Sequence, residues 1–276
     1  MNPTGNPTSS GGTAVSVVLL AAGYGTRLYP LTKDRPKALL PIGPRAMLDI
    51  IMDKVREIPN VRQIVLVTNH RFAEQFRQWQ QQSGQPVEVI DDETSTNETR
   101  LGAIRDLQLG MERLRRPDDV VVLGTDNLFT SSLAEFVRGA KARAPSATVA
   151  LQEVATKEDA KKFGIVELLP DGRIKRLLEK PADPPTRLAA LCVYYFPHAM
   201  HPRFAQFLSD GGNPDAPGYF IEWLVRTEPT YGTVVDGEWF DIGSHETYRE
   251  AVERWGGASS GKPSTSGTRQ PGSSAQ

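Results

Sequence analysis

The chain of 276 residues is 39% hydrophobic and 24% charged, a composition typical of an ordinary globular protein. Its formal net charge of -1 excludes a basic excess for nucleic acid and an acidic excess of the solvating-tail kind, so an anionic ligand must be held by local basic groups and backbone amides. The single cysteine, Cys192, excludes an internal disulfide and a cysteine-based zinc site, and its apolar neighbours indicate a packing residue in a reducing environment.

Both ends of the sequence are rich in small and polar residues. Segments of this kind bury too little apolar surface to offset the entropy lost on ordering, so we expect disordered tails at 1–13 and 256–276 around a folded body at 14–255. The first tail lacks the basic and apolar regions of a secretory signal, and no apolar stretch approaches the ~20 residues of a membrane span. We therefore expect a cytoplasmic protein with neither a membrane nor a nucleic acid as partner.

The first half of the folded body alternates between strand and helix patterns. Short apolar runs predict buried strands at 15–20, 63–67, 87–90 and 119–123. Helical spacing of apolar residues predicts helices at 46–58, 71–82, 101–114 and 131–143. This alternation indicates a parallel sheet with helices on both faces.

The second half has a different pattern. Strands are predicted at 148–152, 163–168, 174–179 and 188–196, and helices at 197–208, 219–226 and 244–254. Pro170-Asp171-Gly172 lies between two of these strands and indicates a hairpin turn. We expect one α/β domain whose later strands add antiparallel pieces and a substrate lid.

A glycine-rich stretch with two basic residues follows the first strand. It reads LAAGYGTRLYPLT at 20–32 and RPKALLPI at 35–42. Glycines beyond the carboxyl end of a strand let backbone N–H groups approach phosphate oxygens, and Arg27 and Lys37 can neutralise a triphosphate. The stretch lacks the Gly-Lys-Ser/Thr of a Walker loop, and Leu28 stands where a dinucleotide fingerprint has its third glycine. The simpler alternative is a glycine turn with two solvated basic residues.

Two acidic residues far apart in the sequence have similar surroundings. Asp126 follows the strand at 119–123, where a carboxylate beside the phosphate loop is well placed for Mg²⁺. Asp241 lies between apolar residues before a glycine, in Trp239-Phe240-Asp241-Ile242-Gly243. From the residues alone, Asp126 could equally form an Asx-turn and Asp241 a helix N-cap.

These stretches together resemble the sugar-phosphate nucleotidylyltransferases, which include glucose-1-phosphate thymidylyltransferases and UTP–glucose-1-phosphate uridylyltransferases. The match is close from Leu20 to Ile42 and continues in patches to about Ala251. The resemblance implies a Rossmann-like α/β fold: a mixed, mostly parallel sheet with helices on both faces and an added antiparallel sugar-binding portion. It also implies one Mg²⁺ between Asp126 and Asp241, catalytic roles for Arg27, Lys37 and Lys180, and nucleotide contacts at Ala21, Ala22, Gly23, Gly25, Thr26, Arg100 and Gly102.

The family pattern also implies where the sugar phosphate binds. The runs Phe163-Gly164-Ile165-Val166-Glu167 and Glu179-Lys180-Pro181 match its sugar-binding segments, and a glycine turn opens a predicted helix that carries Glu222. Sugar-phosphate contacts are expected at Asn127, Gly164, Glu179, Lys180 and Glu222. For the last three, the alternative is a surface Glu–Lys pair and a solvent-facing helix residue.

The sequence departs from the family pattern in two places. Thr125 replaces a more usual glycine, although the acid after it is retained. The segment 91–103 lacks the glutamine with which many relatives read a pyrimidine base, and Arg100 could contact a phosphate or cap a loop. The nucleobase therefore stays open. The four histidines show neither zinc-site nor catalytic-triad spacing.

The predicted reaction condenses a nucleoside triphosphate, with dTTP or UTP favoured, and a sugar 1-phosphate, with glucose 1-phosphate favoured, to an NDP-sugar and pyrophosphate. One alternative is a cytidylyltransferase that uses phosphocholine or a similar phosphate, although the two sugar-binding segments favour a sugar. Another is a non-catalytic subunit that senses nucleotide sugars. The resemblance allows a homo-oligomer, but the sequence shows no interface.

Overall fold

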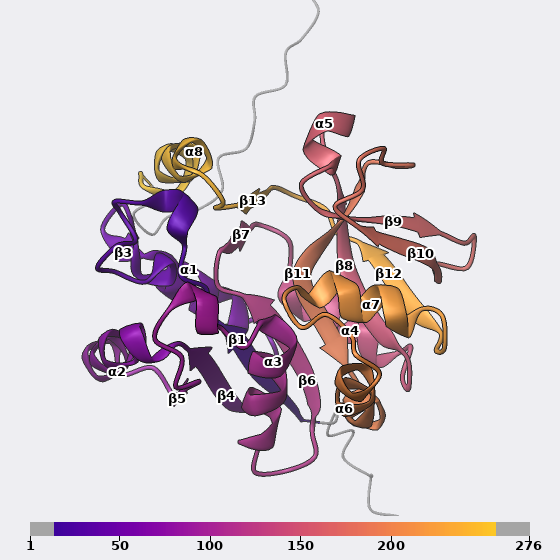
Figure 1. Cartoon of the computed structure of the whole chain (residues 1–276), viewed down its shortest axis with the longest axis horizontal. Helices are drawn as coiled ribbons and strands as arrows, with labels where there is room; N and C mark the ends of the chain where they lie inside the picture. The colour runs from indigo at the N-terminus through magenta and orange to yellow at the C-terminus, as the bar shows by residue number, and fades with distance from the viewer. Residues whose placement is uncertain (1–13, 258–276) are drawn as a thin grey trace, which may run out of the picture.

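The computed structural model describes residues 14–257, in which a central sheet is flanked by helices (Figure 1). The tails predicted at 1–13 and 256–276 lie outside these residues, except that Gly256 and Gly257 form a turn. In the part of the chain that is described, no helix has the length and apolar character needed to span a membrane.

The first half forms the parallel part of the sheet. Its strands are paired in the order β6-β1-β4-β5, with every neighbouring pair parallel. Their bounds are β1 (Val15–Leu20), β4 (Val61–Thr68), β5 (Val87–Asp91) and β6 (Asp119–Gly124). The helices that alternate with them are α1 (Met47–Arg56), α2 (His70–Ser83), α3 (Ala103–Glu112) and α4 (Leu133–Lys141). The predicted alternation of strand and helix is confirmed.

The second half extends the same sheet with antiparallel strands. β11 (Leu188–Phe196) pairs antiparallel with β6 and continues into the order β10-β9-β11-β6-β1-β4-β5. β8 also joins β11, and β12 pairs with β8, which completes nine strands. The remaining bounds are β8 (Ala147–Glu153), β9 (Gly164–Leu168), β10 (Ile174–Glu179), β12 (Thr230–Val234), α5 (Lys157–Ala160), α6 (His201–Ser209), α7 (Pro217–Leu224) and α8 (His245–Trp255).

Apolar side chains on the two faces of the sheet form two separate cores. Along β1, Val17 and Leu19 face a core shared with α1, α2 and α4, whereas Val18 faces a core shared with α3, α6 and α7. Successive residues of a strand point to opposite faces, so a strand covered on both sides must be apolar throughout. This explains why the predicted strands of the first half are continuous apolar runs rather than alternating ones.

Two short strand pairs and the last helix complete the described fold. β13 (Trp239–Asp241) pairs antiparallel with β7 (Asn127–Phe129), and β2 (Pro41–Ile42) pairs with β3 (Arg45–Ala46). α8 then lies against β2, and Figure 1 shows it beside the indigo N-terminal part of the described chain. The Tyr248 hydroxyl donates to the Pro41 carbonyl at 2.7 Å, and His245 Nε2 is 2.8 Å from the Tyr29 carbonyl.

A pair of buried carboxyl groups lies between β5 and α3. Asp92 and Asp106 are each 6% exposed, and each has one oxygen without a hydrogen-bond partner among the described residues. Burial, reinforced by the neighbouring charge of Asp92, raises the pKa of Asp106 to about 8. A proton shared between the two groups accounts for both unpaired oxygens, so near neutral pH the pair carries fewer than two negative charges.

Replacing Asp106 with asparagine is expected to stabilise the protein increasingly as pH rises. In the folded wild type Asp106 keeps its proton up to about pH 8, whereas the unfolded chain releases it near the ordinary value of about 4. Wild-type stability is therefore lost between these two pH values, at up to about 1.4 kcal/mol per pH unit. The amide introduced by the substitution supplies an N–H donor to Asp92 without titrating.

Urea unfolding of wild type and Asp106→Asn at pH 5 and pH 8 measures this effect. The variant should gain on the order of a few kcal/mol relative to wild type between the two pH values. Asp183→Asn, at an exposed position, should show no such gain. An equal stability difference at both pH values would contradict the shared proton.

Candidate active site

The loop after β1 presents backbone N–H groups at the carboxyl edge of the parallel strands. Gly25 has φ 61°, the left-handed region that favours glycine, and it precedes a short 3₁₀ turn at Thr26–Leu28. The Thr32 hydroxyl donates to the Gly25 carbonyl at 2.7 Å and closes the loop. A side chain added at Gly23 would meet no atom within 4 Å, so the loop leaves open space there for a ligand.

Neighbouring strands hold this loop from behind. The Asn69 amide donates to the Ala22 carbonyl at 2.9 Å, and the Thr125 hydroxyl donates to the Leu20 carbonyl at 2.8 Å. Thr125 is the residue that departs from the glycine of the family pattern. Its hydroxyl connects the end of β6 to the end of β1. This bond fixes the start of the loop after β1 relative to Asp126, the residue that follows Thr125.

The two acids predicted as metal ligands are brought together by the β7–β13 pair. Asp241 pairs in register with Asn127, and the backbone N–H of Ile242 donates to the Asp126 carbonyl at 2.9 Å. Both side chains line the same cleft. A Cβ added at Gly243 would lie 3.0 Å from Asp241 Oδ2 and 3.7 Å from the Arg27 guanidinium. The side chain of Arg27 therefore reaches the neighbourhood of Asp241.

Lys37 makes an ion pair with Asp126. Its side chain is 14% exposed, and its ammonium donates to Asp126 Oδ2 at 2.8 Å. Burial alone would raise the pKa of Asp126, but the charge and hydrogen bond of Lys37 outweigh burial and hold this pKa below its ordinary value. Lys37 therefore lies at the two acids, and its charge also acts on Asp241.

Asp241 has the opposite electrostatic surroundings. Burial and the negative charge of Asp126 raise the pKa of Asp241 to about 6. Among the described residues, its carboxylate oxygens have no hydrogen-bond or ion-pair partner. A nearly buried acid without a partner, facing a second acid, suits a divalent cation, because oxygen ligands and local negative charge are what Mg²⁺ prefers.

The donor set has room for ligands that come from a substrate. Within the described residues, no three His, Cys, Asp or Glu side chains are arranged to hold a metal ion. Two carboxylates completed by substrate phosphates is a usual arrangement for Mg²⁺, which rarely sits in an all-protein cage. Asp126 and Asp241 therefore fit a metal whose remaining ligands are water molecules or substrate phosphates.

The far end of the cleft is formed by the ends of β9 and β10. Glu179 pairs in register with Gly164, and its side chain is only 8% exposed. A Cβ on Gly218 of α7 would lie 1.9 Å from Glu179 Oε2, so this glycine lets the helix approach the carboxylate. Burial raises the pKa of Glu179, partly offset by the charge of Lys180 at 3.7 Å. Lys180 has φ 46°, a backbone conformation that a non-glycine residue adopts only at a cost.

A cleft of about 960 Å³ connects these groups. Seven of the predicted site residues line it: Arg27, Asp126, Asn127, Gly164, Glu179, Lys180 and Asp241. Its wall also contains aromatic residues that the sequence-based prediction missed, among them Phe163 and Trp239, whose ring centroids are 4.8 Å apart. Both belong to motifs that carry predicted site residues, but nothing in the sequence indicated that their rings would face the cleft.

The other predicted residues do not line this cleft, and they are Lys37, Ala21, Ala22, Gly23, Gly25, Thr26, Arg100, Gly102 and Glu222. The guanidinium of Arg100 bonds to Asp215 at 3.0 Å and to the Asn97 carbonyl at 2.8 Å, which is the loop-capping alternative. Glu222 pairs with Arg226 on the same helix at 2.9 Å. Gly102 lies against the Pro214 backbone. The structure thus does not bring Arg100 or Glu222 to the cleft surface.

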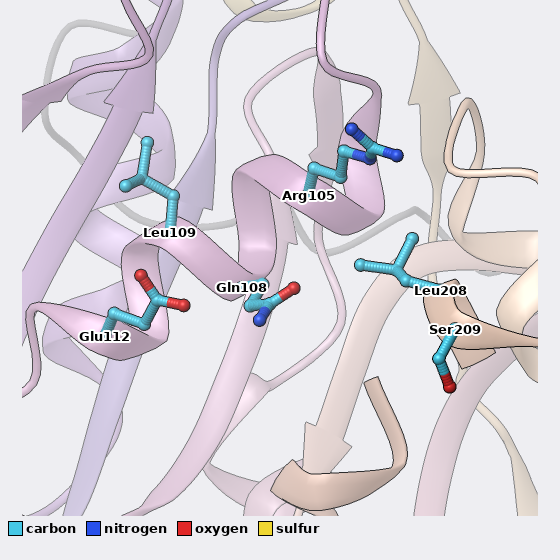
Figure 2. A pocket seen from close by; sticks show the side chains of 6 residues that line it. All are labelled: Arg105, Gln108, Leu109, Glu112, Leu208 and Ser209. Atoms are coloured by element: carbon cyan, nitrogen blue, oxygen red, sulfur yellow. The ribbon is translucent and has the colours of Figure 1, made fainter. Parts of the chain in front are cut away.

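A second hollow lies at α3, which contributes no residue to the larger cleft. It is an open groove of about 440 Å³ between α3 and α6, lined by Arg105, Gln108, Leu109, Glu112, Leu208 and Ser209 (Figure 2). Its lining residues include one cation and one acid, so it lacks the paired carboxylates of the larger cleft. The chemistry expected from the sequence therefore belongs to the larger cleft.

Comparisons with known proteins agree with this geometry. The sequence model of a family described as nucleotidyl transferase matches residues 16–255. Over 248 residues the chain is 27% identical to the UTP–glucose-1-phosphate uridylyltransferase AglF of Haloferax volcanii, covering 87% of this chain and 96% of that protein. It is 28% identical over 236 residues to the low-salt glycan biosynthesis nucleotidyltransferase Agl11 of the same organism, with 85% and 64% covered. The chain thus spans less than two thirds of Agl11.

Solved structures share the fold. A Bacillus anthracis structure, described as a glucose-1-phosphate thymidylyltransferase in complex with sucrose, superposes with a TM-score of 0.77 at 22% identity and covers 90% of this chain and 98% of that one. A UDP-glucose pyrophosphorylase complexed with UDP-glucose gives a TM-score of 0.73 at 21% identity, with 88% and 98% covered. The predicted mixed, mostly parallel α/β fold is confirmed.

Proposed function

The chain belongs to the nucleotidyl transferase family, and from this membership we propose that it is a sugar-1-phosphate nucleotidylyltransferase. Such an enzyme joins a nucleoside triphosphate to a sugar 1-phosphate and releases pyrophosphate. The observation that most strongly supports the proposal is that Asp126 and Asp241 lie together in the wall of the cleft, with the Lys37 ammonium 2.8 Å from Asp126. This arrangement suits a reaction at phosphorus, in which positioning and charge contribute most of the catalysis.

In the proposed reaction an oxygen of the sugar phosphate attacks the α-phosphorus of the triphosphate. The new P–O bond forms as the bond from the α-phosphorus to the bridging oxygen breaks, and pyrophosphate leaves on the opposite side. Arg27 lines the cleft and Lys37 lies beside Asp126, and these two cations are proposed to bind the leaving group. Lys180 lies at the end of the cleft formed by β9 and β10, which we call the acceptor end, and its ammonium can hold and orient the attacking phosphate there.

Asp126 and Asp241 are proposed to hold the divalent cation, with Mg²⁺ the expected ion. When bound, such an ion supplies positive charge that offsets the charge on the phosphates. Lys37 would then exchange its bond to Asp126 for one to a phosphate oxygen, since both acceptors compete for one ammonium. Glu179, buried at the acceptor end, is proposed to accept hydrogen bonds from sugar hydroxyls.

A substrate screen tests the proposal. We expect pyrophosphate release only when one of dTTP, UTP, CTP, GTP or ATP is combined with a sugar 1-phosphate, with glucose 1-phosphate and dTTP or UTP as the favoured pair. Phosphocholine serves as the competing acceptor, because a cytidylyltransferase would release pyrophosphate with CTP and phosphocholine instead. EDTA should abolish the reaction and excess Mg²⁺ restore it. Ligand binding with no pyrophosphate release from any pair would indicate a non-catalytic sensor and contradict the proposal.

A further inference from the structure

Both polar atoms of the Asn127 side chain make a hydrogen bond within the protein. The residue is 4% exposed, its Oδ1 accepts a hydrogen bond from Trp239 Nε1 at 2.6 Å, and its Nδ2 donates to Asp126 Oδ1 at 2.7 Å. The sequence predicted a sugar-phosphate contact at Asn127. With both ends of the amide already bonded, its polar atoms face the acid and the indole instead.

The chemistry of the partners fixes the orientation of this amide. An indole N–H can only donate, so the oxygen of Asn127 must face Trp239. An ionised carboxylate can only accept, so the NH₂ group must face Asp126. The two contacts are therefore mutually consistent in one orientation, and a flipped amide would lose both.

We propose that Trp239 is a positioning residue that orients Asp126 through Asn127, and so fixes one half of the divalent-cation site. Asn127 holds Oδ1 of Asp126, which leaves Oδ2 directed at Lys37 in the free protein. Trp239 lies two residues before Asp241 on β13, and Asn127 pairs in register with Asp241. The hydrogen bonds from Trp239 to Asn127 and from Asn127 to Asp126 thus orient Asp126 from β13, the strand that also carries Asp241. The inference rests on the proposed role of the two acids.

Losing the indole N–H removes the group that fixes the amide. Oδ1 of Asn127 would then be buried without a donor, which is costly enough to favour other orientations of the side chain. A rotated amide directs its oxygen toward the carboxylate of Asp126 and repels it. Groups that orient metal ligands from behind typically contribute 10- to 100-fold in metal affinity or activity.

The indole ring also has a packing role that must be separated from its N–H. Its ring lies 4.8 Å from the ring of Phe163, between the cleft and the α5–β9 segment. Trp239→Phe keeps an aromatic ring and removes the donor, so it isolates the hydrogen bond. Phe163→Leu does the reverse, because it removes the ring contact and leaves the N–H of Trp239 in place.

The chain contains a matched control for the loss of an indole hydrogen bond. Trp79 Nε1 of α2 donates to Asp49 Oδ1 of α1 at 2.9 Å, and neither residue lines the cleft. Trp79→Phe therefore deletes the same kind of bond from the same residue type. Any general effect of the substitution on folding appears in both variants, whereas an effect on the cation site appears in Trp239→Phe alone.

The experiment measures Mn²⁺ binding to the full chain without nucleotide, by electron paramagnetic resonance of free Mn²⁺, together with kcat and KM. Trp239→Phe should weaken Mn²⁺ binding on the order of 10-fold and lower kcat by a similar factor, with the KM of the acceptor little changed. Asn127→Asp keeps the acceptor for Trp239 but places a negative oxygen against Asp126. This variant should therefore also bind Mn²⁺ more weakly than wild type and have a lower kcat. Trp79→Phe and Phe163→Leu should retain wild-type Mn²⁺ affinity.

The outcomes separate this inference from the proposed function. If Trp239→Phe matches wild type in Mn²⁺ affinity and kcat while wild type releases pyrophosphate, the positioning role is overturned and the proposed reaction stands. If Mn²⁺ binding falls only in the Trp239 and Asn127 variants while wild type transfers no nucleotidyl group, the positioning role stands and the proposed reaction fails. If Trp79→Phe loses Mn²⁺ affinity equally, the effect is general and the inference is wrong.

Discussion

Replacing Asp126 with asparagine is expected to lower kcat by on the order of 10²-fold or more, the loss seen when a group that stabilises transition-state charge is removed. The substitution keeps the size and the hydrogen-bonding shape of the side chain while removing its charge. It withdraws one of the two proposed cation ligands and leaves the ammonium of Lys37, whose side chain is 14% exposed, without its carboxylate. Rates of pyrophosphate release at saturating substrates measure the loss.

A surface acid supplies the control for that substitution. Asp53 lies on α1 and pairs with Arg45 at 2.7 Å, outside the cleft, so Asp53→Asn should keep wild-type kcat. Circular dichroism of both variants checks that the fold is retained. Near-normal turnover of folded Asp126→Asn would remove this carboxylate from the reaction and, with it, the proposed cation site.

The second large effect separates charge from backbone strain at Lys180. With φ at 46°, any residue other than glycine is strained at this position by about 1 kcal/mol or more. Lys180→Ala and Lys180→Gly both remove the ammonium, so kcat should fall on the order of 10²-fold in each. Only the glycine variant relieves the strain, so it should be more stable than the alanine variant by about 1 kcal/mol. Urea unfolding gives the stabilities and pyrophosphate release gives the rates.

Glu93 provides the corresponding control for strain without catalysis. It has φ 65° in an exposed loop, so Glu93→Gly should exceed Glu93→Ala in stability by a similar margin while both keep full activity. Equal stability of the two Lys180 variants would mean that the backbone there carries no strain. Retained activity in either would mean that the ammonium does not hold the attacking phosphate.

The regular part of the fold was accessible from the sequence because local pattern and tertiary environment agree there. The strand predicted at 188–196 and the strand predicted at 174–179 have the bounds of β11 and β10. The helix predicted at 71–82 is α2 with one residue added at each end, where Asn69 caps the first turn and Gly84 ends the last. Long runs with a clear period leave few alternative structures, so their type is set locally.

The pieces that complete the candidate site could not be found in this way. β7 and β13 have three residues each, too few to show a period, and they pair across more than a hundred positions. β12 was missed because Gly232 interrupts its apolar pattern. The ion pair of Lys37 with Asp126 and the amide of Asn127 depend on this pairing, so motif spacing alone could not indicate them. The motifs predicted which residues gather, whereas the contacts among them follow from long-range strand pairing.

The contacts of α8 with Tyr29 and Pro41 affect the order in which the chain folds during its synthesis. A ribosome makes the glycine loop and Asp126 early, and the parallel strands that carry them can pair at once. Asp241 is synthesised just before α8, and the hydrogen bond from Tyr248 to Pro41 forms only once α8 has been made. A growing polypeptide can therefore fold its first half while still attached to the ribosome, whereas the proposed cation site is complete only after β13 has left the exit tunnel and paired with β7.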